Sequence, residues 1–140
     1  GKRLVRSPKV YVRDSGLVHA LLGLPDLDAV LSHPVAGSSW EGFVVEQLIN
    51  AAPSAQASFY RTSNGAEVDL VLEFRNSQTW VIEIKRSSAP TVSKGFYTAA
   101  TDLSASRKLL VAPVEQFYPM KDGIEVMSPL KAAQLIASMS

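Results

Sequence analysis

EVDLVLEFRNSQTWVIEIKRS, at residues 67–87, is the stretch of this sequence that decides the fold. Two runs rich in valine, isoleucine and leucine flank a polar segment, and this pattern predicts two strands joined by a turn. Charged residues interrupt both runs: Asp69 lies in the first, and Glu83 and Lys85 lie in the second. Charges are unusual inside strands that are otherwise so apolar, so these three residues are candidates for a functional site.

The spacing of the three charges predicts where they point. Side chains of a strand alternate between the two faces of a sheet, so residues two positions apart share a face. Glu83 and Lys85 should therefore lie side by side, and Asp69 should share its side with Val71. If the two strands pair, Asp69 can face the same region as the Glu83–Lys85 pair.

The composition is that of one compact globular domain. The 140 residues suffice for a single hydrophobic core, and 46% hydrophobic with 19% charged residues excludes an intrinsically disordered chain. The sequence has no cysteine, which excludes disulfides and thiolate metal sites. No apolar run approaches the roughly 20 residues that cross a membrane, and the start GKRLVRSPK lacks a signal-peptide segment. We therefore expect a cytoplasmic protein without membrane contact.

The charges are almost balanced, since 14 Lys and Arg stand against 13 Asp and Glu, a net charge of +1. A protein that coats nucleic acid over a broad face usually has a clearer basic excess. Contact with DNA or RNA should therefore depend on a local cluster. The candidates for contact with phosphates are Arg61, Ser63, Arg86 and Lys94, and the alternative is that they are ordinary surface residues.

Helices and strands are expected on both sides of the 67–87 stretch. Their order predicts an α/β fold with a central mixed β-sheet flanked by α-helices. We expect strands over residues 10–13, 58–61, 67–74, 80–85, 108–113 and 124–127, and helices over residues 17–22, 25–34, 38–52, 92–103 and 129–138.

A third acidic residue comes from the helix expected over residues 38–52, which a serine cap begins and Pro53 ends. At roughly 100° per residue, Glu41 falls within the apolar arc that contains Val44 and Leu48. A carboxylate on a buried stripe loses solvation free energy unless it is paired or binds a metal. Glu41 is therefore a further site candidate.

Converging carboxylates repel one another, and a divalent cation relieves that repulsion. An oxygen-rich site of this kind suits Mg²⁺ or Mn²⁺ rather than Zn²⁺. A cation held by Asp69, Glu83 and the backbone carbonyl of Ile84 would polarise a phosphoryl oxygen and lower the pKa of a bound water, as phosphodiester hydrolysis requires. Lys85 would orient that water or offset charge on the phosphate. Glu41 would complete the shell through a ligating water.

Each of these residues also has a simpler structural explanation. An E-x-K pair is common on solvated sheet faces, and a single Asp at the start of a strand is usually a turn or edge residue. Glu41 is favoured near a helix start by the helix dipole. Only the ordered combination of a helical Glu, a strand Asp and Glu-x-Lys on the next strand favours the site.

That ordered set resembles the PD-(D/E)xK nuclease superfamily. Gly37-Ser38-Ser39-Trp40-Glu41 is similar to the G-S-x-x-E start of archaeal Holliday-junction resolvases, Val68-Asp69 stands where the family often has Pro-Asp, and Glu83-Ile84-Lys85 is an intact E-x-K. The resemblance implies a restriction-endonuclease-like fold, catalytic roles for Glu41, Asp69, Glu83 and Lys85, and DNA as the favoured substrate. Since junction nucleases often work as dimers, it also makes a homodimer an assembly to test.

Four longer segments resemble the C-terminal domain of unknown function of bacterial and archaeal AAA-type ATPases. They are SPKVYVRDSGL, HPVAGSSWEGFVVEQL, FYRTSNGAEVDLVLE and IEIKRSSAPTVSKGF. The resemblance implies an N-terminal ATPase partner domain. Residues 1–36 would then be an arm with short helices on the linker side, and residues 37–140 the nuclease-like domain. No G-x-x-x-x-G-K-S/T occurs, so this chain should bind no ATP itself.

Two functions remain open at this point. The first is a metal-dependent nuclease under the control of the attached ATPase. The second is a catalytically inactive nuclease-like fold that acts as a regulatory or protein-interaction module of the ATPase.

Overall fold

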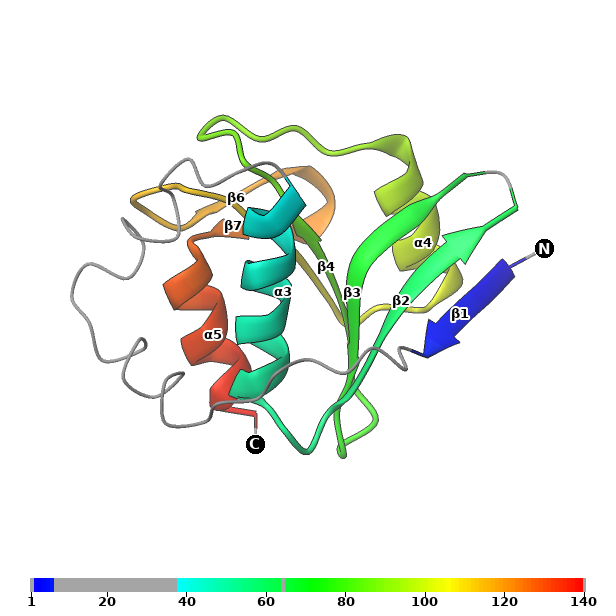
Figure 1. The fold of residues 1–140 in the computed structure, drawn as a ribbon. Helices are drawn as coiled ribbons and strands as arrows, with labels where there is room; N and C mark the ends of the chain where they lie inside the picture. The colour runs from blue at the N-terminus through cyan, green and yellow to red at the C-terminus, as the bar shows by residue number, and fades with distance from the viewer. Residues whose placement is uncertain (1, 7–37, 64, 140) are drawn as a thin grey trace.

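A computed structural model describes residues 2–6, 38–63 and 65–139 (Figure 1). The strand expected over residues 10–13 and the helices expected over residues 17–22 and 25–34 lie outside the described residues. The expected boundary between residues 1–36 and 37–140 also lies outside them.

Within the described residues, seven strands form one mixed sheet in the order β1-β2-β3-β4-β5-β7-β6. The β4–β5 and β5–β7 pairs are parallel, and the other neighbours are antiparallel. The strands are β1 Lys2–Arg6, β2 Gln56–Thr62, β3 Glu67–Glu73, β4 Thr79–Ile84, β5 Arg107–Val111, β6 Tyr118–Pro119 and β7 Ile124–Met127.

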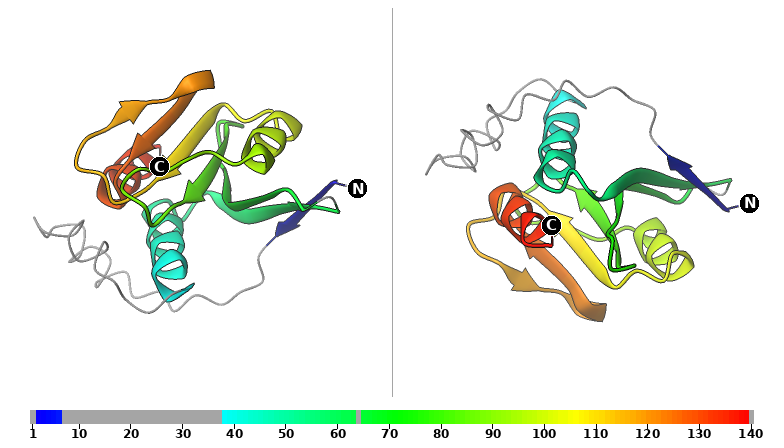
Figure 2. Two further views of the ribbon diagram at one scale, coloured as in Figure 1. Left: turned by 90° about the horizontal axis from the view of Figure 1, so that it is seen from above. Right: turned by 90° about the horizontal axis from the view of Figure 1, so that it is seen from below.

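Three helices cover the two faces of this sheet: α3 Ser38–Ala51, α4 Lys94–Asp102 and α5 Pro129–Ala137. Helices α3 and α5 lie side by side on one face, and α4 lies on the other (Figures 1 and 2). A short 3-10 turn, η1 Lys121–Gly123, precedes β7. The expectation of an α/β fold with a central mixed sheet flanked by helices is confirmed.

Two separate hydrophobic clusters follow from this layering. The cluster beneath α3 and α5 contains Leu48, Ile82 and Ile136, and the cluster beneath α4 contains Val81 and Phe96. The central strands are apolar on both faces because each face is covered by a helix, as is usual for sheets with parallel strands. No described helix is both long and apolar enough to cross a membrane.

Serine residues begin the two shorter helices. Ser93 Oγ accepts a hydrogen bond from the backbone N–H of Phe96 at 3.2 Å, and Ser128 Oγ accepts one from Lys131 at 3.1 Å. Each bond satisfies an N–H group that has no partner within the first helical turn. These caps fix where α4 and α5 start.

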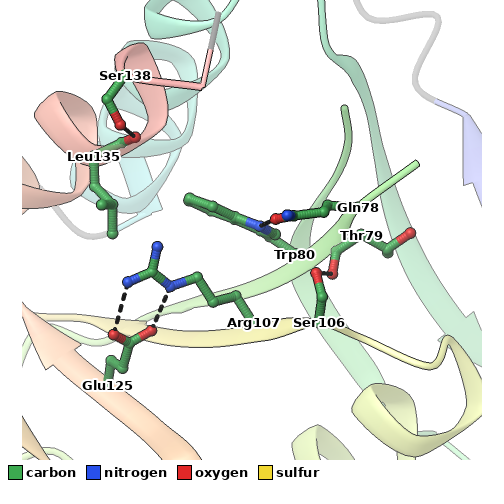
Figure 3. A network of polar contacts seen from close by, with 8 residues as sticks. All are labelled: Gln78, Thr79, Trp80, Ser106, Arg107, Glu125, Leu135 and Ser138. Atoms are coloured by element: carbon green, nitrogen blue, oxygen red, sulfur yellow. Dashed lines mark hydrogen bonds and ion pairs between the residues drawn. The ribbon is translucent and has the colours of Figure 1, made fainter. Parts of the chain in front are cut away.

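A polar network ties β5 to β7 on the α3 and α5 face. The Arg107 guanidinium donates two hydrogen bonds to Glu125, at 2.8 and 3.0 Å, and lies 5.0 Å from the ring centroid of the buried Trp80. The indole N–H of Trp80 donates to Gln78 at 3.1 Å. Figure 3 shows Arg107 reaching Glu125 with the indole beside it. We assign this network to the stability of the sheet, since bidentate pairs and cation–π contacts hold neighbouring strands together.

Candidate functional site

Strands β3 and β4 separate at one end, which we call the β3–β4 fork. Their ladder ends at the pair formed by Leu70 and Ile82. Beyond that pair, the first two residues of β3 are paired with β2, while the last two residues of β4 are paired with β5. The fork therefore opens between Asp69 on one side and Glu83 with Ile84 on the other.

A bulge in β3 lies at the mouth of the fork. Asp69 and Leu70 together occupy the place of a single residue of β2. Val68 and Val71 lie three positions apart, yet both pack in the cluster beneath α4. Because a bulge re-aims side chains, the simple alternation that we expected between Asp69 and Val71 does not continue through this part of β3.

The Asp69 side chain bridges the fork. Its Oδ2 accepts a hydrogen bond from the backbone N–H of Ile84 at 2.8 Å. Ile84 lies two residues beyond the last β3–β4 pair, where a continued ladder would have offered a backbone carbonyl. The Asp69 side chain thus accepts the hydrogen bond that a backbone carbonyl of β3 would otherwise accept. This bond fixes the Asp69 carboxylate beside the end of β4.

Glu83 and Lys85 lie side by side, as the spacing of two predicts. Lys85 Nζ is 3.8 Å from Glu83 Oε1, and the two side chains are 30% and 15% exposed. The other oxygen, Glu83 Oε2, is buried and has no hydrogen-bond partner among the residues that the structure describes. A buried, unpaired carboxylate oxygen carries a large solvation cost, so it needs a proton or a cation.

The electrostatics show that the acids are near one another. Burial first, and then the charges of Asp69 and Glu41, raise the pKa of Glu83 to about 7, although Lys85 opposes them. Burial also raises the pKa of Asp69, against the hydrogen bond from Ile84, and the charge of Glu41 adds to the rise. Glu41 lies in the first turn of α3 and is partly buried. Three acids from three elements therefore act on one region.

The three acids influence one another in pairs. The charge of Asp69 is the largest charge effect on the pKa of Glu83, and the charge of Glu41 is the largest charge effect on the pKa of Asp69. No group of three or more His, Cys, Asp or Glu side chains in the described part of the chain is arranged to hold a metal ion.

A family described as a domain of unknown function, DUF4143, matches residues 36–132. The chain belongs to this family. The matched range contains Glu41, Asp69, Glu83 and Lys85, so every acid and the lysine of the fork lie within the DUF4143 domain.

The DUF4143 domain is also similar to two uncharacterized mycobacterial proteins, one from Mycobacterium bovis and one from Mycobacterium tuberculosis. Each is 42% identical over 124 residues. These residues are 89% of this chain but 28% of each relative, so the chain spans less than a third of the length of these relatives. No solved structure matches the chain.

The basic candidates of the DUF4143 domain do not all lie together. Arg61 Nε is 3.3 Å from Glu67 Oε1, and its guanidinium lies 5.5 Å from the ring centroid of Phe59. Arg86 and Lys94 are exposed, on the segment that follows β4 and at the start of α4. Ser63 is exposed near the β2–β3 turn. Arg61 thus lies on the outer side of β3, away from the fork.

Two features that position the site were missed by the sequence reasoning. The first is the bulge in β3, for which the run of apolar residues around Asp69 gives no signal. The second is Gly95: a Cβ at this position would lie 3.2 Å from the Cα of Ala66. The first turn of α4 therefore packs tightly on the start of β3, and a glycine as the second residue of the helix was the signal that could have indicated it.

Proposed function

We propose that this domain hydrolyses phosphodiester bonds of nucleic acid, DNA in the first place, with Mg²⁺ or Mn²⁺. The observation that carries the proposal is the fork, where the carboxylate of Asp69 is bound beside Glu83 and Lys85. Sequence order and geometry support it jointly, because a helical Glu, a strand Asp and Glu-x-Lys act on one region although they are far apart in the chain.

The residues fit a cation bound mainly by two carboxylates. Asp69 uses Oδ2 for the Ile84 N–H and retains Oδ1 for a ligand. Glu83 Oε2 is buried and has no hydrogen-bond partner within residues 2–6, 38–63 and 65–139, and a cation would compensate its charge. When bound, the ion would polarise a phosphoryl oxygen and acidify a water. The Ile84 carbonyl is the third ligand that we propose, and Glu41 would contact the site through water.

Lys85 would act on the substrate side. Its side chain is 30% exposed, and its Nζ lies 3.8 Å from Glu83 Oε1, a distance at which the pair is loose. If a cation neutralises Glu83, the ammonium becomes available to orient the attacking water or to offset charge on the phosphate.

We further propose that the domain belongs to the PD-(D/E)xK superfamily and is the C-terminal part of an AAA-type ATPase. The motif order from Glu41 to Lys85 supports the first statement. The second is supported by the length of the mycobacterial relatives, of which the chain spans 28%. The ATPase would then control access to the nuclease site.

A cleavage assay tests the hydrolysis. Purified protein is incubated with supercoiled plasmid and with labelled single strands, in Mg²⁺, in Mn²⁺ and in chelator. Asp69→Ala, Glu83→Ala and Lys85→Ala should each lower the cleavage rate by about 100-fold or more, with circular dichroism unchanged. Glu115→Ala, at an exposed loop position, is the matched control and should cleave normally. Metal binding without any cleavage, with and without the ATPase part, would refute the proposal.

Two observations favour the second candidate, an inactive nuclease-like module that regulates the ATPase or binds a protein. Asp69 Oδ2 and Glu83 Oε1 already have partners within the protein, and the described residues contain no three-acid metal group. Calorimetric titration with Mn²⁺ separates the two candidate functions. If the protein binds Mn²⁺ at micromolar concentration and Asp69→Ala abolishes this binding, the acids form a metal site and the inactive module is excluded.

A further inference from the structure

The backbone of Lys85 is fixed at the fork, but the contact of its side chain is weak. The Lys85 N–H donates to the carbonyl of Val111 at 2.8 Å, so the pairing of β4 with β5 continues one residue beyond Ile84. Lys85 Nζ lies 3.8 Å from Glu83 Oε1, which is longer than a hydrogen bond. A lysine side chain is flexible and carries its charge at a single point. The ammonium therefore lies beside Glu83 without a hydrogen bond that would fix it to that carboxylate.

The charge of the ammonium acts on both carboxyls of the fork. Burial raises the pKa of Asp69 and that of Glu83, and the charge of Glu41 adds to both rises. The charge of Lys85 lowers both pKa values. One positive charge thus stabilises the ionised forms of two acids on two different strands, which is also what a bound cation would do at the same place.

A single ammonium compensates the fork only in part. Glu83 Oε2 is buried and has no hydrogen-bond partner in the part of the chain that the structure describes, although Lys85 lies near the other oxygen of the same carboxylate. An ammonium carries one charge, whereas Mg²⁺ and Mn²⁺ carry two and bind carboxylate oxygens directly. A divalent ion would therefore compensate the oxygen that Lys85 leaves without a partner.

A divalent ion and the ammonium would repel each other, because both would lie beside the carboxylate of Glu83. A double and a single positive charge about 6 Å apart in water repel each other by a free energy that corresponds to roughly tenfold in a binding constant. The Lys85 side chain is 30% exposed, so it can turn toward solvent and reduce this repulsion. Metal binding should still be weaker with the ammonium than without it.

We propose that Lys85 is an internal counter-ion of the β3–β4 fork, which offsets the charge of Asp69 and Glu83 when no metal is bound and weakens the binding of Mg²⁺ or Mn²⁺. The inference rests on the proposed function and adds a regulation of its metal site. The fork keeps a partly compensated charge without metal, and the affinity for metal is lower than the two carboxylates alone would give.

Calorimetric titration of the full 140-residue chain with Mn²⁺ tests this proposal. At pH 8, above the pKa of about 7 to which burial raises Glu83, protons compete little with the metal. Lys85→Met removes the charge and keeps the length of the side chain, and it should tighten Mn²⁺ binding by roughly five- to tenfold. Lys85→Arg keeps the charge and should bind Mn²⁺ as the natural chain does.

Two further variants make the titration specific. Lys85→Gln also removes the charge and should change the affinity in the same direction as Lys85→Met, with circular dichroism as the check of folding. Lys121→Met is the matched control, because Lys121 is exposed in η1, next to β7 and two strands away from β4. Its affinity for Mn²⁺ should equal that of the natural chain.

Two results would overturn the internal counter-ion. The first is that Lys85→Met and Lys85→Gln bind Mn²⁺ no more tightly than the natural chain. The second is that Lys85→Arg tightens binding as much as Lys85→Met, since the charge would then not be the cause.

The titration follows metal binding and not cleavage, so it separates this inference from the proposed hydrolysis. Tighter binding by Lys85→Met together with absent cleavage by the natural chain contradicts only the hydrolysis. Unchanged binding by Lys85→Met together with metal-dependent cleavage by the natural chain contradicts only the internal counter-ion. If neither the natural chain nor Lys85→Met binds Mn²⁺, both are contradicted.

Discussion

The carboxylate of Asp69 accepts a hydrogen bond from the backbone N–H of Ile84 at 2.8 Å, across the gap where β3 and β4 cease to pair. This one contact has two roles. Its mechanical role is to connect β3 to β4 where their backbone hydrogen bonds have ended. Its electrostatic role is to hold the Asp69 carboxylate beside Glu83.

The mechanical role is tested by comparing two substitutions at position 69. Asp69→Asn keeps an oxygen that accepts from Ile84 and removes the charge, whereas Asp69→Ala leaves the N–H without a partner. At pH 7 we expect Asp69→Ala to be less stable than Asp69→Asn by about 1–3 kcal/mol in the free energy of unfolding. Urea denaturation measures this difference, and equal stabilities would show that the hydrogen bond contributes nothing.

The electrostatic role predicts an unusual dependence of stability on pH. In the unfolded chain Glu83 titrates near 4.5, and in the folded domain its pKa is about 7. Between these values the folded state holds a proton that the unfolded state has lost, so stability falls as pH rises from 4.5 to 7. The free energy of unfolding above pH 7 is therefore lower by about 3 kcal/mol than it is below pH 4.5.

Glu83→Gln removes this titration. In chelator, we expect the variant to gain stability relative to the natural chain as pH rises from 4.5 to 7, and to keep that advantage at pH 8. Glu115→Gln, at an exposed position, is the control and should follow the natural profile. If the free energy of unfolding of Glu83→Gln and of the natural chain changed with pH in the same way, Glu83 would not be a buried carboxylate with a raised pKa.

The end of α4 offers a test of the fold that is independent of the site. Ser104 has a φ of 51°, and the N–H of Ala105 donates to the carbonyl of Ala100 at 3.0 Å, an arrangement in which glycine is favoured. Ser104→Gly should raise the free energy of unfolding by about 1 kcal/mol. Thr98→Gly, in the interior of the same helix, should lower it. A destabilised Ser104→Gly would mean that α4 ends differently.

The sequence predicted the layers of this fold well because they depend on strong local patterns. Continuous apolar runs indicated β3, β4 and β5, and a serine before a dense apolar pattern indicated α3. The outer strands β1 and β6 were not predicted. Strand β6 has only two residues, and the Lys- and Arg-rich β1 pairs with a strand more than 50 residues away, so neither carries a local signal.

The candidate site was predicted in its residues but not in its geometry. The spacing of Glu83 and Lys85 indicated their contact because a regular strand fixes it. The orientation of Asp69 depends on a bulge and on the divergence of two strands, which are tertiary properties. The position of Glu41 relative to Asp69 and Glu83 depends on how α3 packs against the sheet, which the helical pattern alone does not determine.

The most direct test of the account is a crystal of the domain grown with Mn²⁺, examined by anomalous diffraction. We expect one strong anomalous peak in the β3–β4 fork, about 2.0–2.3 Å from a carboxylate oxygen of Asp69 and one of Glu83, with Glu41 reached through water. The same crystal of Asp69→Asn should show a much weaker peak. A fork without manganese, or manganese bound only elsewhere, would contradict the claim that these acids form a cation site.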